Sequence, residues 1–186
     1  MATNNTTNSI INFKNNFYGG TRANRFVVIP EWPEGVLVDP NDSTFKIVSA
    51  SLPMVQVNNI AVPYRGRMIN FAGDRQYSTW TVGVYDDSNS KNIWKGLHKW
   101  SEFLDGHYTH TVKDADYSYK KLQTTWKIIQ LGLNGDMNNP IKTITLYKCW
   151  PSVVGELNLN MSEVGFVGFS TTLTFDYINI EDNYNS

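Results

Sequence analysis

The 186-residue chain has one cysteine, no long apolar run and almost no net charge. The single Cys149 excludes an internal disulfide and a four-cysteine metal site. Its place in an apolar strand pattern predicts a buried, unreactive thiol. No segment approaches the ~18 apolar residues that a membrane-spanning helix needs. Residues 1–9 lack the basic-then-apolar pattern of a signal peptide. The sequence therefore predicts a protein made in a cytoplasm, with no membrane partner.

The chain also has no excess of either sign of charge. A formal net charge of −1 and the absence of a Lys/Arg block exclude strong long-range attraction for nucleic acid. Arginines near aromatic residues could suggest single-strand binding on a sheet: Arg22, Arg25, Arg65, Arg67 and Arg75. Nearby carboxylates offset the positive charge of these arginines, which disfavours single-strand binding. They are Glu31, Glu34, Asp39, Asp42 and Asp74. Near-neutrality leaves little repulsion to oppose association of copies.

Motifs for covalent chemistry are missing. The chain has no nucleophile elbow, phosphate-binding glycine loop or dinucleotide fingerprint. Of the three histidines, His98, His107 and His110, the last two could share a metal only with a third ligand from Asp105, Asp114 or Asp116, and solvated loop histidines are commoner. The carboxylate pairs at 86–87 and 114–116 resemble a helix cap and a turn more than an acid–base pair. We expect no enzyme, cofactor or metal.

Aromatic residues and strand patterns are abundant. Aromatics make up 13% of the chain and include six tryptophans, which favours protein association. Alternating apolar residues predict strands at 26–29, 44–52, 55–62, 64–72, 76–85, 122–133, 141–148, 156–161 and 166–178. Turns are expected at Gly73-Asp74 and at 134–140, and a loop at 32–43.

The last predicted strand has the clearest alternation. One face carries Phe169, Thr171, Leu173, Phe175 and Tyr177. The other carries Ser170, Thr172, Thr174 and Asp176. Such a strand buries one face and wets the other, so the second face should be hydroxyl-rich with a single carboxylate.

One helix is predicted at about 90–105. Ile93, Leu97, Trp100 and Leu104 recur at helical spacing. The run 86–88 supplies capping side chains and Gly106 ends the helix. Three lysines share a polar face: Lys91, Lys95 and Lys99. That face is either simply solvated or a docking surface for an acidic partner.

Many short strands leave edges that must be covered. Residues 64–72 contain no proline and offer Met68, Ile69 and Phe71 for packing. Closed rings remove edges, so a cyclic homo-oligomer is the expected solution.

In order and spacing, several segments resemble the tail tube proteins of T-even-like contractile-tailed bacteriophages. They are Thr21 to Phe26, Ser51 to Pro53, Arg67 to Val82, the helix around Trp100, Tyr119 to Lys121, Trp150-Pro151 with Gly155 to Leu159, and Thr172 to Tyr177.

The resemblance implies a mainly β fold: two roughly orthogonal antiparallel sheets forming a barrel-like sandwich, with one flanking helix. It implies hexameric rings stacked into a hollow tube in the virion, inside a contractile sheath. DNA and the tape measure protein would pass through the lumen without specific binding. Sheath, baseplate and tail terminator proteins would be further partners.

Site roles follow from the same resemblance. Contacts between subunits or rings are expected at Arg65, Arg67, Met68, Phe71, Gly73, Asp74, Arg75 and Trp150. Thr172, Thr174 and Asp176 are expected to face the lumen, and Lys91, Lys95 and Lys99 to face the sheath.

The expected organisation is an N-terminal arm at 1–20, one domain at 21–180 and a tail at 181–186. The loops at 32–43 and 134–140 look longer than the family pattern. Two related roles with the same fold therefore stay as alternatives. These are a baseplate protein that initiates the tube and the inner tube of a phage-like injection or secretion machine. A carbohydrate-binding β-sandwich is an alternative of another class.

Overall fold

A computed structural model describes residues 10, 13, 14, 17, 20–88, 91–112, 119–162 and 164–182. Most of the expected arm at 1–20, and residues 183–186 of the expected tail, lie outside these ranges. The described strands are β1 (Phe26–Ile29), β2 (Ile47–Ala50), β3 (Val55–Tyr64), β4 (Arg67–Tyr77), β5 (Trp80–Tyr85), β6 (Thr124–Gln130), β7 (Lys142–Val154), β8 (Gly168–Thr174) and β9 (Tyr177–Asp182). The described helices are α2 (Pro40–Lys46), α3 (Ile93–Leu104) and α4 (Tyr119–Leu122).

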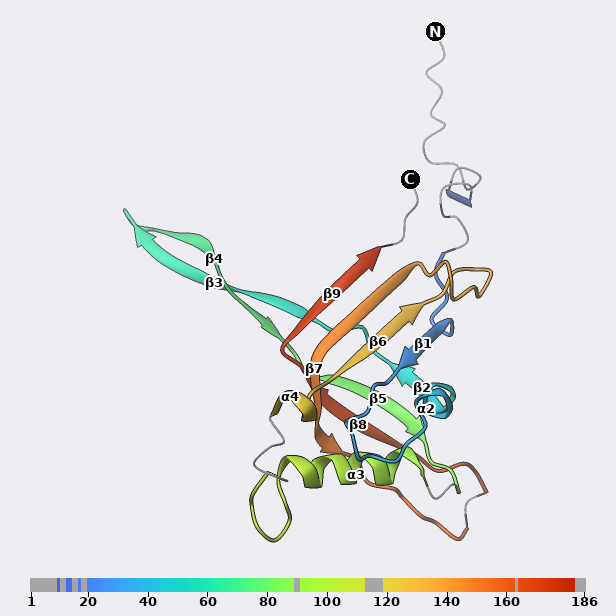
Figure 1. The fold of residues 1–186 in the computed structure, drawn as a ribbon. Helices are drawn as coiled ribbons and strands as arrows, with labels where there is room; N and C mark the ends of the chain where they lie inside the picture. Colours follow the sequence, from blue (N-terminus) through green and yellow to red (C-terminus); the bar gives the residue numbers. More distant parts are fainter. Residues whose placement is uncertain are drawn as a thin grey trace.

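The long strand β7 connects the two halves of the main sheet. The hydrogen-bonded order is β1-β6-β7-β8-β5-β2, with β9 also paired to β7. Residues 142–149 of β7 pair with β6 and β9, whereas residues 150–154 pair with β8. In Figure 1, β5 and β8 run across the direction of β1, β6 and β9. The mainly β, sandwich-like fold is thus confirmed, and among the described residues the sheet does not close into a barrel.

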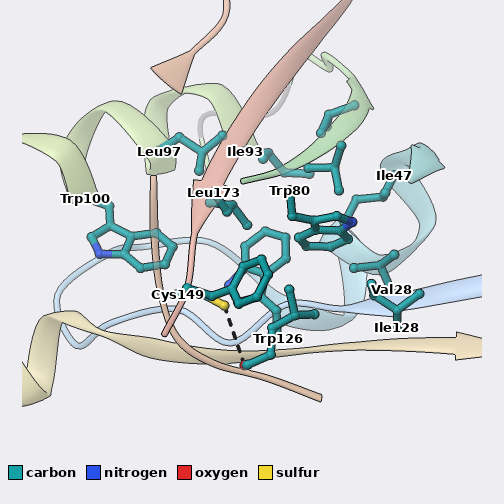
Figure 2. Packing of buried hydrophobic residues seen from close by; sticks show 14 of the residues in the cluster. Val28, Ile47, Trp80, Ile93, Leu97, Trp100, Trp126, Ile128, Cys149 and Leu173 are labelled. Carbon is teal, nitrogen blue, oxygen red and sulfur yellow. Dashed lines mark hydrogen bonds between the residues drawn. The ribbon is translucent and has the colours of Figure 1, made fainter. Parts of the chain in front are cut away.

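Tryptophans form the centre of the core. Trp80, Trp100 and Trp126 are essentially fully buried, and Figure 2 shows them between α3 and the strands below it. The Trp126 ring lies edge-on to Trp80 and to Trp32, at centroid distances of 5.9 and 5.8 Å. A buried indole N–H needs an acceptor. Each of the three fully buried tryptophans donates to a backbone carbonyl: Trp80 to Ser51 at 2.6 Å, Trp100 to Leu122 at 2.7 Å and Trp126 to Glu31 at 3.1 Å. The buried indole N–H of Trp32 has no hydrogen-bond partner among the described residues.

Helix α3 confirms the predicted helix, its apolar stripe and its end before Gly106, but not its N-cap. Ile93, Leu97 and Trp100 are buried against the sheets. The N-cap is Asn92, whose side-chain oxygen accepts a hydrogen bond from the backbone N–H of Lys95 at 2.9 Å. The prediction of a cap from 86–88 was wrong. An amide side chain directly before the first helical turn satisfies an orphan N–H that the more distant aspartates do not reach.

Other element predictions also need correction. Residues 44–46 belong to α2 instead of a strand, because Asp39 caps a helix whose first residue is Pro40. The strand predicted at 156–161 is absent, since these residues form a loop. The predicted strand at 166–178 is two strands, β8 and β9, separated at residues 175–176. Only one helix was expected, whereas α2 and α4 are also present.

Candidate assembly interface

The β3–β4 hairpin projects from the body of the molecule (Figure 1). Its strands pair from Val55 with Tyr77 to Tyr64 with Arg67, leaving a two-residue turn of Arg65 and Gly66. Both turn residues have positive φ, 46° and 80°. A tight hairpin turn of this kind requires positive φ at both central positions, which explains the glycine.

The predicted turn at Gly73-Asp74 was wrong, because both residues lie inside β4. The pairs flanking them are Val57 with Arg75 and Asn59 with Ala72, so β4 holds one extra residue here, a β-bulge. A Cβ at Gly73 would lie 3.0 Å from the backbone oxygen of Asn58. Glycine in a strand marks such a close approach as readily as a turn.

The outer half of the hairpin has one apolar face. Residues paired directly across an antiparallel ladder share a face, and Ile60 pairs with Phe71 and Val62 with Ile69. We call this set the distal apolar face: Ile60, Val62, Tyr64, Ile69 and Phe71, each between 42% and 55% exposed. The opposite face is more polar, with Asn59 donating a hydrogen bond to Asn70 at 3.0 Å.

Near the body, the apolar side chains lie on the other face of the hairpin. Side chains of β3 alternate between the two faces from Val55 to Tyr64, so the odd-numbered Val55 and Val57 lie opposite the even-numbered members of the distal apolar face. Tyr77 pairs with Val55 and shares its face. Tyr77 packs against Phe175 of the body at a centroid distance of 5.7 Å. The inner half is therefore anchored, while the outer half projects with an exposed apolar face. Two strands alone are marginally stable in water, so the outer half needs a partner surface.

Seven of the eight predicted contact residues lie on this hairpin, in its turn or on β4. The eighth, Trp150, lies on β7 opposite Thr174 and packs half-buried against the core. Sequence reasoning missed the β3 side of the distal apolar face. Alternation of Ile60, Val62 and Tyr64 was the available signal. Contacts of all these residues with other copies stay a prediction.

The predicted lumen residues occupy the exposed side of β8 and the break after it. Thr172 and Thr174 are partly exposed, opposite the buried Thr171 and Leu173. The hydroxyls of Thr81 and Thr172 lie 3.2 Å apart. This confirms the alternation from Phe169 to Phe175. Tyr177, expected on the buried face, is instead 46% exposed at the start of β9. Which compartment the exposed face meets stays a prediction.

Asp176 is paired. Its carboxylate oxygen accepts a hydrogen bond from the ammonium nitrogen of Lys148 at 3.0 Å, which raises the pKa of Lys148. The carboxylate expected on this face is therefore balanced by a cation within the same copy.

The lysine face is only partly helical. Lys95 and Lys99 are exposed on α3, while Lys91 precedes the N-cap. The ammonium of Lys99 lies 2.7 Å from a carboxylate oxygen of Glu102. A role of these lysines toward the sheath stays a prediction.

The described residues show little that could support reactions. They contain no group of three or more His, Cys, Asp or Glu side chains arranged to hold a metal ion. Asp114 and Asp116 lie outside them. The Nδ1 atom of His110 lies 3.7 Å from an Asp105 carboxylate oxygen, and both side chains are highly exposed. His98 packs beside Trp94 at 4.1 Å, and burial lowers its pKa.

Cys149 is fully buried, as predicted, and burial raises the pKa of its thiol to about 12. None of the described helices combines the length and apolar character needed to cross a membrane.

Comparison with known proteins identifies the family. Residues 35–181 match the family described as phage tail tube protein. The chain belongs to this family. A tail tube protein from Enterobacteria phage T4 is 29% identical over 135 residues, covering 72% of this chain and 79% of the relative. The tail tube protein of Serratia phage KSP90 is 26% identical over 115 residues, covering 62% and 61%. The resemblance is confirmed, and as a phage tail tube protein the chain is a virion component.

Solved structures share the fold of this tail tube protein. The cap that terminates the tube of the anti-feeding prophage matches with a TM-score of 0.60 at 15% identity, covering 87% of this chain and 91% of that one. A chain of the sheath–tube complex of an extracellular contractile injection system matches with a TM-score of 0.58 at 12% identity, covering 95% and 99%. At such identities the likeness concerns the fold alone.

Proposed function

We propose that this tail tube protein is a structural subunit whose copies form hexameric rings. The rings stack into a hollow conduit for DNA and the tape measure protein, inside a contractile sheath. Baseplate and terminator proteins close the two ends. The domain at 21–180 is the building unit, and its function is assembly instead of catalysis.

One observation carries the proposal: the distal apolar face is exposed and projects from the body. Five large apolar side chains that are 42–55% exposed form a patch of the kind that marks a protein interface. Open edges add to the argument. Among the described residues β1, β2 and β9 each pair on one side only, and unpaired strand edges associate readily with other chains.

The exposed face of β8 suits the wall of a conduit. Lys and Arg contacts are what hold nucleic-acid phosphates, and this face offers the hydroxyls of Thr172 and Thr174 instead. The ammonium of Lys148 is paired with Asp176. Such a wall lets DNA slide, because it neither binds phosphate strongly nor carries a large unbalanced charge.

The test is assembly of purified protein by negative-stain electron microscopy and sedimentation velocity. The native chain should form rings or tubes. Phe71→Asp places a charge on the distal apolar face and should abolish tubes while leaving folded protein. Phe45→Asp is the matched control: Phe45 is 85% exposed on α2, and the variant should assemble. Normal tubes from Phe71→Asp would contradict the proposal.

Tube length distinguishes a tube subunit from a baseplate protein that initiates the tube. A chain of the anti-feeding prophage baseplate shares this fold with a TM-score of 0.58 at 12% identity. An initiator protein should stop at single rings, whereas a tube subunit should produce long tubes at the same concentration.

A further inference from the structure

A second exposed apolar surface lies on the loop between β7 and β8. Four of its side chains are almost fully exposed: Leu159 at 82%, Met161 at 106%, Val164 at 104% and Phe166 at 91%. Solvated loops carry polar residues, so a cluster of this kind marks an interaction site.

The two ends of this loop are firmly held. The backbone N–H of Gly155 donates to the carbonyl of Ser170 at 2.9 Å, and the carbonyl of Val167 accepts from the N–H of Asp86 at 2.9 Å. The ring of Phe166 also contacts Tyr85, at a centroid distance of 6.4 Å. The apolar side chains are therefore presented from a loop with fixed ends.

The loop and the outer half of the hairpin lie at opposite ends of the molecule (Figure 1). They cannot meet within one copy. Each nevertheless carries large exposed apolar side chains, and their charges are opposite. Residues 55–77 contain three arginines and one aspartate, whereas residues 155–167 contain Glu156 and Glu163 and no Lys or Arg.

We propose that the distal apolar face of one copy docks onto the β7–β8 loop of a second copy. This inference rests on the proposed tube, in which it is a contact between subunits of successive rings. Two different surfaces at opposite ends of one chain make a head-to-tail contact, which repeats without limit unless the rotation closes it. Arg65 and Arg67 meet the exposed Glu156 at the rim, and opposite charges there fix the register.

A second copy fits this loop better than a protein of another kind. Both surfaces belong to one chain, so a single contact covers both in every copy. An acidic partner would suit the arginines but not the loop, and a basic partner the reverse.

Disulfide cross-linking tests the contact directly. Because Cys149 is fully buried, the native chain offers no competing exposed thiol. The variant carrying Ile69→Cys and Met161→Cys should give a ladder of covalent multimers on mild oxidation of its assemblies. The control carrying Ile69→Cys and Leu133→Cys places the second thiol at a 50% exposed position outside both surfaces, and it should give none.

Each other outcome has a distinct meaning. Tubes of the first variant that show no ladder would overturn the docking while leaving the tube proposal intact. Covalent dimers from Ile69→Cys alone would also overturn it, because hairpins would then meet hairpins. Absence of tubes from the native chain would instead remove the tube proposal itself.

Mixing variants gives an independent test. Phe71→Asp inactivates the hairpin and leaves the loop intact, whereas Met161→Asp does the reverse. Each alone should lose all stacking. A mixture retains one functional hairpin–loop junction per pair, so it should give two-ring stacks and nothing longer. Full-length tubes from Met161→Asp alone would overturn the proposal.

Discussion

The ammonium nitrogen of Lys148 lies 3.0 Å from a carboxylate oxygen of Asp176, where β7 passes from one half of the sheet to the other. Lys148 has a φ of 59°, a left-handed conformation that side chains other than glycine adopt with strain. A register shift between Thr124 and Trp126 places an additional β7 residue at this point. The bend that joins the two halves therefore depends on one strained residue.

Replacing Lys148 separates strain from ion pairing. Lys148→Ala and Lys148→Gly both remove the pair with Asp176, but only glycine relieves the left-handed backbone. We expect Lys148→Gly to melt about 2–4 °C above Lys148→Ala, since relieving such strain is worth about 1 kcal/mol. Thermal unfolding followed by circular dichroism measures the difference. Equal melting temperatures would show that the bend is unstrained.

Gly155 should tolerate no side chain. A Cβ there would lie 2.1 Å from the backbone oxygen of Ser170, and the Gly155 carbonyl accepts a hydrogen bond from the Trp94 indole at 3.3 Å. Gly155→Ala must move backbone, which costs about 1–3 kcal/mol as in overpacked cores. Gly165→Ala in the same loop is the control, because no atom lies within 4 Å of its added Cβ. Urea unfolding should show a loss only for Gly155→Ala.

At Gly96, a substitution by alanine has two opposing effects, a gain in helix propensity and a steric clash. In an exposed helix, Gly→Ala would stabilise by about 1 kcal/mol. In α3 the added Cβ would lie 2.2 Å from a Val38 methyl carbon, so we expect net destabilisation of about 1–2 kcal/mol. Adding Val38→Ala should recover part of that loss, because it removes the clashing methyl. A double-mutant cycle in urea measures the coupling. Simple additivity would mean that Val38 moves aside freely.

Strand faces were predictable where the period-2 pattern was unbroken. Trp80, Val82 and Val84 were expected on one face of a strand, and all three are buried. The same holds for Phe169, Thr171 and Leu173 on β8. A one-residue slip would exchange the faces of a whole strand, so alternation specifies burial strongly even when strand ends are uncertain.

Turns, bulges and strand ends were less predictable than strand faces, because one residue type occurs in several backbone geometries. Glycine and aspartate at 73–74 form a bulge, while the real turn contains Arg65 at positive φ, which no turn preference signals. Alternating Leu157, Leu159 and Met161 imitate a strand, yet the last two are exposed on a loop. The hairpin was located through the β4 residues. Its β3 side depends on cross-strand pairing, which a single sequence does not contain.

The thiol of Cys149 should make stability depend on alkaline pH. Its pKa of about 12 exceeds the ordinary value of 9.0, chiefly because burial disfavours the thiolate. Between these values the unfolded chain has lost a proton that the folded chain retains, so stability falls as pH rises. At pH 10 this thiol should cost about 1.4 kcal/mol relative to pH 8.

Comparison with Cys149→Ala isolates this effect from the tyrosines and lysines that titrate in the same range. The variant is expected to be less stable near neutrality, because it leaves a small cavity. Its free energy of unfolding should nevertheless fall less steeply with pH than that of the native chain, and urea unfolding at pH 8, 9 and 10 measures both slopes. A thiol-specific reagent at pH 8 should label the native chain only after urea is added. Rapid labelling of folded protein, together with parallel pH slopes, would show that Cys149 is reachable by solvent.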